Sequence, residues 1–327
     1  MRRSYSSLPL DPFAGRRLPQ AGDHLSPLRD LRSSAISAMT LFSVSSTSSA
    51  STPPLACTVR DCALPIERRE RVYICGRGHS YDIARSGYVN LLQPQDRRSL
   101  HAGDSTEAVA ARAALLDAGV GRTLIDAVVD KSLSLDLPER PVITDLGSGT
   151  GDALAAIGER RAITGVGIDI STAAADHAAR RFPNYTWVVA NADRRLPLLD
   201  GSVDLVLSLN GRRNPEQTAR ILKPEGILLI VLPAPDDLIE LRTLVQGEGV
   251  QRERGDALVA AHRQWFEVIH RSPFKETITL ERESLLHLLR TTYRGARLTS
   301  AARVAAIDRT SVTLASEVFV LSLIPNP

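Results

Sequence analysis

All three cysteines of the chain fall in one short segment, and a histidine follows them. Four residues separate Cys57 from Cys62, and three separate Cys75 from His79. Two such pairs, joined by a hairpin-sized segment, supply the four soft or borderline ligands that a tetrahedral zinc site needs. The alternative is that the cysteines are ordinary small apolar residues and that His79 is a surface histidine. Because every cysteine of the chain takes part, the spacing favours Zn²⁺.

A second group of chemically capable residues begins with Asp145. This carboxylate closes a β-branched run and is followed by glycines at alternate positions, Gly147, Gly149 and Gly151. Such glycines let a ligand approach the backbone closely, and a helix N-terminus beyond them favours electronegative groups. The dinucleotide fingerprint is G-x-G-x-x-G, whereas the spacing here is G-x-G-x-G. S-adenosylmethionine carries a cationic sulfonium and an ammonium, so a carboxylate beside the loop suits this ligand better than a pyrophosphate.

Two further carboxylates stand at the ends of expected strands. Residues 163–168 are typical of a strand, and Asp169 after them can accept hydrogen bonds from both hydroxyls of a ribose. Residues 185–190 predict another strand, which places Ala192 and Asp193 near an adenine edge. The alternative for each lone aspartate is a solvated turn residue. The recurrence favours an adenosylmethionine site, and the cofactor-binding residues that we expect are Asp145, Gly147, Gly149, Thr150, Gly151, Asp169, Ala192 and Asp193.

The elements around these motifs alternate between strand and helix. Residues 203–209 and 227–232 predict strands, and residues 152–159 and 219–222 predict helices. This alternation predicts an α/β fold with a Rossmann-like, doubly wound methyltransferase sheet. Ligands of such sheets bind at the carboxyl ends of the strands, where the motifs cluster.

The C-terminal third has a weaker pattern. A helix is expected around residues 284–291. Residues 311–314 and 318–323 are two short strand-like runs, which we expect to form an antiparallel hairpin at the end of the sheet.

Composition places the chain among globular proteins. Its 327 residues, 43% of them hydrophobic, suffice for one large domain and a small one. A formal net charge of +3 neither demands nor excludes a polyanionic partner, so any nucleic-acid surface must be local. The three clustered cysteines cannot all pair in disulfides, which fits a reducing compartment. Neither a secretory signal nor a long apolar span is recognisable. We therefore expect a cytoplasmic protein with no membrane partner.

The chain divides into four expected parts. Residues 1–55 form a Ser-, Arg- and Pro-rich tail that we expect to be disordered. Residues 56–100 would form the zinc-binding module, and residues 101–138 a helical connector broken by glycines 119 and 121. Residues 139–327 would form the S-adenosylmethionine-dependent methyltransferase domain.

From about residue 57 to residue 323 the chain resembles the bacterial large-subunit (23S) rRNA guanine-N1 methyltransferases, which include enzymes of tylosin-type macrolide resistance. Besides the zinc cluster, the resemblance rests on the string YDIARSGYVNLL at residues 81–92, and on Gly103-Asp104-Ser105 with Glu107 and Ala111-Arg112. Similarity to the macrolide-resistance branch rests on Arg213-Asn214-Pro215-Glu216, followed by Arg220-Ile221-Leu222.

The resemblance implies an enzyme that methylates N1 of a guanine in a hairpin loop of 23S rRNA. It implies that the zinc module engages the RNA while the Rossmann-like domain holds the methyl donor, and it is compatible with a homodimer. A further cofactor contact is implied at Asp237, where the family has a histidine. The target base would enter beside residues 210–214, where Asn210-Gly211-Arg212 replaces the family's aromatic-x-Pro.

The general base is not identified by the sequence. Asp104 and Glu107 lie in the family-like string, but helix capping explains both equally well. Two alternative functions stay open. One is a methyltransferase acting on another RNA or on a small molecule, and the other is a catalytically inactive, zinc-dependent RNA-binding protein of the same fold.

Overall fold

The computed structural model of the chain describes residues 52–96, 103–246, 253–291, 304 and 307–324. The expectation of a disordered tail concerns residues 1–55, of which residues 1–51 lie outside these ranges, so it stays a prediction. Within the described ranges, no helix is both long and apolar enough to cross a membrane.

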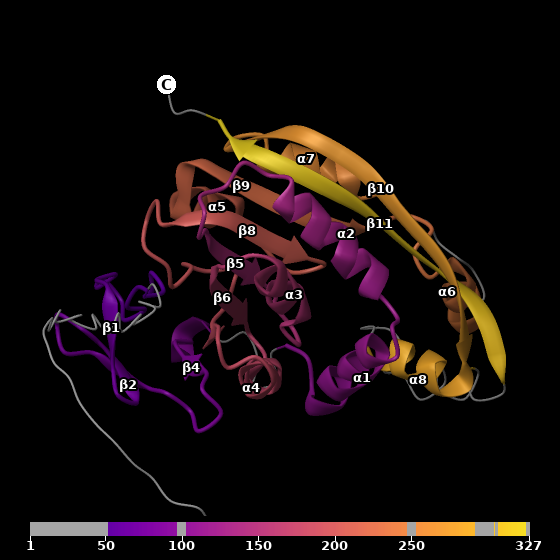
Figure 1. Ribbon diagram of the computed structural model, residues 1–327, viewed down its shortest axis with the longest axis horizontal. Coiled ribbons are helices and arrows are strands. Elements are labelled where there is room, and N and C mark those ends of the chain that lie inside the picture. The colour runs from indigo at the N-terminus through magenta and orange to yellow at the C-terminus, as the bar shows by residue number, and fades with distance from the viewer. Residues whose placement is uncertain (1–51, 97–102, 247–252, 292–303, 305–306, 325–327) are drawn as a thin grey trace, which may run out of the picture. The chain divides into compact units, whose positions relative to one another are not determined.

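An eight-stranded sheet forms the centre of the described fold (Figure 1). Its strands are β4 (Val89–Asn90), β5 (Val142–Leu146), β6 (Thr164–Asp169), β7 (Thr186–Val189), β8 (Val203–Leu209), β9 (Leu222–Pro233), β10 (Phe266–Glu281) and β11 (Arg309–Leu323). They lie in the order β10-β11-β9-β8-β5-β6-β7-β4, and β5 to β9 pair in parallel. The direction of winding reverses between β5 and β8, which is where such sheets bind ligands at their C-terminal ends. The expected Rossmann-like, doubly wound fold is confirmed.

Helices cover both faces of this sheet. They are α1 (Thr106–Asp117), α2 (Arg122–Leu133), α3 (Asp152–Arg160), α4 (Thr172–Arg181), α5 (Pro215–Ile221), α6 (Ile239–Gln246), α7 (Gly255–His262) and α8 (Arg282–Arg290). On one face, α2, α3 and α4 contribute Val128, Leu154 and Ala178 to a buried cluster. On the other face, α5 and α7 contribute Ile221 and Leu258 to a second cluster. Burial of both faces explains why the parallel strands are continuous apolar runs in the sequence.

Two glycines divide the helical connector, as the sequence predicts. Gly119 and Gly121 lie between α1 and α2 with φ angles of +87° and +84°, a backbone conformation that favours glycine. The Ser105 hydroxyl accepts a hydrogen bond from the Ala108 amide and caps α1. On its other side, α1 packs against α8 (Figure 1).

The cysteine-containing segment forms a small antiparallel sheet of β1 (Ile66–Arg69), β2 (Val72–Cys75) and β3 (Ser80–Asp82). The chain then enters β4, which pairs in parallel with β7, at the edge of the large sheet. The register joins Val89 to Val188 and Asn90 to Val189, and the Leu91 amide donates to the Val189 carbonyl. The segment that carries the expected zinc ligands therefore continues into a strand of the methyltransferase sheet.

The C-terminal hairpin expected between residues 311–314 and 318–323 is wrong. Both runs belong to one continuous strand, β11, which pairs antiparallel with β10 on one side and β9 on the other. The Ala315-Ser316-Glu317 interruption looked like a turn, but backbone pairing continues through it because Ser316 and Glu317 have partners on both flanking strands. The sequence pattern did not predict β10, an edge strand in the described sheet, because its side chains are mostly exposed and it contains Pro273.

Candidate functional site

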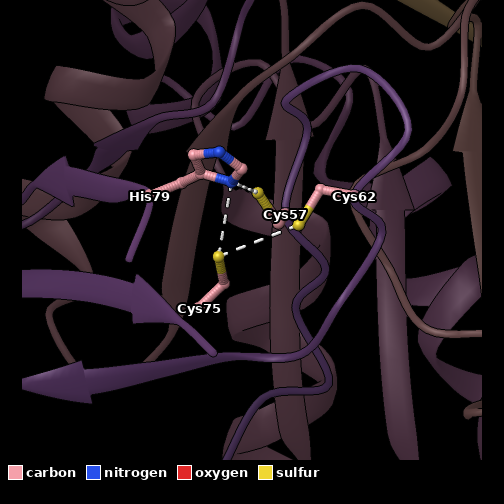
Figure 2. A group of neighbouring side chains, drawn as sticks. All are labelled: Cys57, Cys62, Cys75 and His79. Carbon is pink, nitrogen blue, oxygen red and sulfur yellow. Dashed lines mark hydrogen bonds between the residues drawn. The ribbon is translucent and has the colours of Figure 1, made fainter. Parts of the chain in front are cut away.

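The four expected zinc ligands converge in the structure. Figure 2 shows the three sulfur atoms and the His79 ring directed toward one another. His79 Nδ1 lies 3.4 Å from the sulfurs of both Cys57 and Cys75, and the sulfurs of Cys62 and Cys75 are 3.8 Å apart. All ligand atoms lie within 4.8 Å of one another. A tetrahedron with Zn–S bonds of about 2.3 Å has edges of roughly 3.8 Å, so the donor set fits a four-coordinate zinc ion.

Backbone turns hold each ligand pair. The Cys62 amide donates to the Val59 carbonyl, and the Cys75 amide donates to the His79 carbonyl. The Tyr81 hydroxyl lies 3.0 Å from the Cys57 sulfur and accepts a hydrogen bond from the Thr58 amide. Tyr81 is therefore an outer contact of the ligand set that the sequence did not reveal.

The thiols differ in acidity. Burial raises the pKa of Cys57 to about 11, although its Tyr81 hydrogen bond opposes the shift. Desolvation also opposes ionisation of Cys75, but hydrogen bonds from the amides of Arg77 and His79 help lower its pKa to about 7. A bound zinc ion takes thiolates, so it would stabilise the ionised form of each ligand cysteine.

The glycine loop leaves β5 and is fixed to the end of β6. The amides of Gly147 and Ser148 donate to the Ile168 carbonyl, and the Gly149 amide donates to Asp169 Oδ2 at 2.9 Å. Gly147, Gly149 and Gly151 all have positive φ angles. A Cβ on Gly151 would lie 2.5 Å from the ring of Trp187, so this position admits no larger residue without movement.

Asp145, the last residue but one of β5, is a buried carboxylate just before this loop. It is 2% exposed, and its Oδ1 has no hydrogen-bond partner among the described residues. Burial raises the pKa of Asp145 to about 7, and the negative charge of Asp169 adds to the shift. A buried anion without a partner is costly, and a cationic ligand would relieve that cost. The orphaned oxygen therefore fits the cationic methionine portion of adenosylmethionine.

Asp169, at the end of β6, is already hydrogen bonded to the backbone. Its Oδ2 accepts from Gly149, and its Oδ1 accepts from the Ser171 amide at 2.8 Å. Burial raises the pKa of Asp169, and these two amides oppose the shift. Each carboxylate oxygen keeps a second lone pair, which leaves acceptor capacity for ribose hydroxyls.

Ala192 and Asp193 follow β7, as expected. The Asp193 amide donates to Asn191 Oδ1, which fixes the turn, and the Asn191 side-chain amide donates to the Asp96 carbonyl. Asp193 also pairs with Arg212, which follows β8, at 3.2 Å. The structure thus joins the loops after β7 and β8, two segments that the sequence could place only separately.

The connector contributes side chains that were not among the expected cofactor contacts. Arg112 of α1 lies over the glycine loop, because a Cβ on Gly149 would be 3.6 Å from Arg112 Cδ. The guanidinium pairs with Asp104 at 3.0 Å, and its Nε is buried without a hydrogen-bond partner among the described residues. The Asp104 carbonyl accepts a hydrogen bond from the Ser171 hydroxyl. The family-like string therefore holds α1 against the loop, and no sequence spacing indicated that contact.

The loop after β8 passes close to the glycine loop. A Cβ on Gly211 would lie 2.2 Å from the Leu146 carbonyl oxygen, and a Cβ on Gly147 would lie 3.0 Å from Gly211 Cα. Asn210 beside it has a φ of +56°, a strained conformation that asparagine tolerates better than most residues. The segment where a target base was expected therefore borders the expected cofactor loop.

Asp237 follows β9, and its contacts differ from those of the other expected cofactor residues. Its Oδ1 accepts a hydrogen bond from the Ala315 amide of β11 at 3.0 Å. Burial raises the pKa of Asp237 to about 6, although this hydrogen bond opposes the shift. Its contacts in the described structure connect β9 to β11 and not to the glycine loop.

Two family models match the chain. Residues 143–226 match a family described as "Methyltransferase domain". Residues 56–100 match a zinc ribbon family described as "RlmA, N-terminal". With the converging Cys₃His cluster, these matches confirm the two expected cofactors, S-adenosylmethionine and Zn²⁺.

Three curated relatives cover most of the chain. It is 35% identical over 228 residues to 23S rRNA (guanine(748)-N(1))-methyltransferase of Streptomyces fradiae. The aligned region covers 68% of this chain and 80% of that protein. A protein of Micromonospora griseorubida named for guanine-N(1) methylation of 23S rRNA is 34% identical over 259 residues, with 72% and 85% coverage. A similarly named protein of Bacillus subtilis (strain 168) is 30% identical over 244 residues, with 72% and 84% coverage. The chain therefore belongs to the family of 23S rRNA (guanine-N1) methyltransferases.

Proposed function

We propose that this protein transfers a methyl group from S-adenosylmethionine to N1 of a guanine in 23S rRNA. One observation carries the proposal: a single chain combines a Cys₃His zinc site with a buried Asp145 carboxylate just before a glycine loop, and Oδ1 of that carboxylate has no hydrogen-bond partner among the described residues. The zinc site fits the RNA-side module of the family, and the carboxylate fits a cationic methyl donor.

The cofactor-binding residues in this proposal come from the ends of β5, β6 and β7. Asp145 faces the cationic methionine portion, and the backbone of the glycine loop, residues 147–151, lines the approach to it. Asp169 accepts from the ribose hydroxyls, and Ala192 and Asp193 meet the adenine. Arg112 adds a positive charge beside the loop for the carboxylate of the methionine portion.

Asp237 has a different part in this proposal. Its hydrogen bond to the Ala315 amide supports a role in fixing the loop after β9 against β11. That loop follows a strand of the parallel sheet, so Asp237 acts on the site through the position of its backbone. A direct cofactor contact at Asp237, which the family resemblance implies, stays a prediction.

The RNA is held by the zinc module in this proposal, with Cys57, Cys62, Cys75 and His79 as the ligands of one zinc ion. A hairpin loop suits the reaction because its bases are unstacked and can enter a pocket at low cost. The proposed compartment is the cytoplasm, where free thiols and ribosomes occur together. A homodimer stays a prediction, and sedimentation of the purified protein tests it.

The chemistry demands alignment more than acid catalysis. When bound, S-adenosylmethionine supplies a methyl group on a cationic sulfur, which leaves as a neutral thioether. This chain's residues must therefore hold the guanine N1 in line with that group and exclude water. The loop after β8 borders the glycine loop, so the base entering beside residues 210–214 meets the donor from that side.

Methyl transfer to protein-free 23S rRNA from a strain lacking the corresponding gene tests the proposal. Label from adenosylmethionine should appear at N1 of a guanine with the wild-type protein and be absent with Asp145→Ala. Exposed Asp136→Asn on the connector serves as the matched control. Cofactor binding without label in the RNA would move the function to another substrate. Absence of cofactor binding in the wild-type protein would favour a catalytically inactive RNA-binding protein.

A further inference from the structure

Arg213 is held rigidly in the loop after β8. Its Nη1 donates to the Ser208 hydroxyl at 3.2 Å and to the Gly211 carbonyl at 2.9 Å. Ser208 is fully buried in β8, and Gly211 is packed against the backbone of Leu146. One nitrogen of the guanidinium is therefore anchored both to β8 and to the loop after it.

The remaining donors of Arg213 are unused. Its Nε and Nη2 have no hydrogen-bond partner, and it forms no ion pair, among the residues that the structure describes. Arg220 of the neighbouring helix α5 offers a contrast, because it pairs with Asp200 and donates to the Leu196 and Leu198 carbonyls. Burial lowers the pKa of Arg213, and no carboxylate offsets the shift. A half-buried cation without an anionic partner is costly and typical of a functional site.

The groups around Arg213 do not supply that partner. On α7, His262 is 3% exposed, its Nδ1 lies 2.8 Å from the Leu258 carbonyl, and its Nε2 has no partner within the described structure. Burial lowers the pKa of His262, the hydrogen bond to the Leu258 carbonyl opposes the shift, and the charge of Arg213 adds to it. On α5, Glu216 is exposed, and on β5, the buried Asp145 carboxylate lies just before the glycine loop. Neither carboxylate forms an ion pair with Arg213.

Arg213 belongs to the segment, residues 210–214, beside which the target base enters in the proposed reaction. The loop that carries Arg213 borders the glycine loop through Gly211, and strained Asn210 begins it. A guanine N1 is mostly protonated at neutral pH and is a nucleophile only after that proton leaves. The charge left behind is shared between N1 and O6, so a donor aimed at O6 favours the reactive form.

We propose that Arg213 is a catalytic residue that donates hydrogen bonds to O6 of the target guanine and stabilises its N1-deprotonated form. The inference rests on the proposed function. The N1 proton passes to water, and the N1 electron pair forms a bond to the methyl carbon. The bond between that carbon and sulfur breaks, and its electron pair stays on the sulfur. No separate general base is needed, which accounts for a site in which sequence and structure identify none.

The alternative acceptor for Arg213 is a phosphate oxygen of the target nucleotide. The experiment distinguishes that oxygen from O6 of the guanine. Single-turnover methylation of a 23S rRNA fragment is followed from about pH 6 to about pH 9. The proteins compared are wild type, Arg213→Gln and Arg213→Lys, with exposed Arg160→Gln on α3 as the matched control. Affinities for adenosylmethionine and for the RNA fragment are measured separately, and thermal unfolding shows that each variant folds.

We expect Arg213→Gln to lower the rate near neutral pH by about 100-fold, the usual effect of removing one donor to a developing oxyanion. The rate of this variant should recover as the pH rises, because hydroxide then replaces the lost help in deprotonating N1. Arg213→Lys should restore part of the rate, and affinities for cofactor and RNA should change by less than about threefold. The control variant should follow the wild-type profile.

Two results would overturn the assignment of O6. The first is an unchanged rate in both folded variants. The second is weaker RNA binding with an unshifted pH profile, which would assign Arg213 to a phosphate. If the wild-type protein methylates no guanine N1, the proposed function fails and this inference fails with it. If the wild-type protein methylates guanine N1 and the pH–rate profiles of the Arg213 variants match the wild-type profile, the inference fails and the proposed function stands.

Discussion

Single side chains determine the electrostatics of the cofactor site. Asp145 is buried and Asp169 half-buried at neighbouring strand ends, and the negative charge of Asp169 disfavours the ionisation of Asp145. Asp169 is compensated by two backbone amides, whereas Asp145 Oδ1 has no such compensation in the described structure. The asymmetry leaves one carboxylate whose charge depends on the ligand, and its protonation should therefore be linked to binding.

Adenosylmethionine affinity should rise with pH through about 7. The pKa of Asp145 is about 7 in the free protein, so below that pH the group is mostly neutral and attracts the cation poorly. Above it, the affinity should level off. Isothermal titration calorimetry in buffers of different ionisation enthalpy should also detect proton release on binding below pH 7.

Asp145→Asn should bind adenosylmethionine about 10- to 100-fold more weakly at pH 8, since a hydrogen bond to a charged group is worth roughly 1.5–3 kcal/mol. The variant should also lose the pH dependence. A pH dependence that persists in Asp145→Asn would assign the titration to another group, such as Asp169. Exposed Asp136→Asn should behave like the wild type.

Tyr81 should tune the affinity of the zinc site without being a ligand. Its hydroxyl contacts the Cys57 sulfur and the Thr58 amide, so Tyr81→Phe removes a group that orients the first ligand. Outer contacts of this kind typically change metal affinity by about 10- to 100-fold. Competition with a chromogenic chelator measures the effect. Tyr73→Phe, buried on β2 of the same small sheet, is the matched control, and an equal loss in both variants would contradict a specific role.

At the scale of elements, the sequence predicts the part of the fold that is buried on both faces. The bounds of β6, β7 and β8 are each expected to within one residue, because continuous apolar runs ending in glycine or a polar residue mark such strands. Helix α5 begins earlier than expected, at Pro215, because the Asn214 side chain caps it and proline suits the first helical position.

The elements that the sequence does not predict are those defined by distant partners. The two residues of β4 are recognisable as a strand only beside β7. The half-exposed side chains of β10 follow no clear apolar pattern. At the site, the ends of the parallel strands could be identified from their residue types, whereas the contacts of Arg112, Tyr81 and Arg213 depend on tertiary packing.

The close approach of two loops leads to a prediction for Gly211. An alanine there would place its Cβ 2.2 Å from the Leu146 carbonyl, so the loop after β8 must move away from the glycine loop. Overpacking of this kind costs about 1–3 kcal/mol. We expect Gly211→Ala to lower the thermal stability and the methylation rate together. Gly76→Ala, whose nearest contact would be an ordinary 3.8 Å, is the control, and a fully active Gly211→Ala would contradict the packing argument.

At the scale of the whole molecule, zinc and adenosylmethionine should be separable in their effects. Cys75→Ser or a strong chelator should release about one zinc ion per chain, because four donors converge on one point. RNA binding should fall before cofactor binding, since the proposed cofactor residues lie at the C-terminal ends of β5, β6 and β7. Metal analysis, RNA gel shift and calorimetry measure the three quantities. Freshly purified protein without zinc, or equal losses of both affinities, would contradict this separation.

The pairing of β4 with β7 limits how the protein can be divided. The zinc-bearing segment ends in β4, an outer strand of the large sheet. A cut before Val89 would therefore separate the zinc-binding turns from this strand. Chimaeras that exchange zinc-bearing segments between relatives should therefore place their junction after Leu91, so that the donor's β4 moves with its own metal-binding turns. Exchanges made between β3 and β4 would instead separate the donor's metal-binding turns from the strand into which they lead. Recombination that preserves activity should thus be confined to the segment between Leu91 and α1.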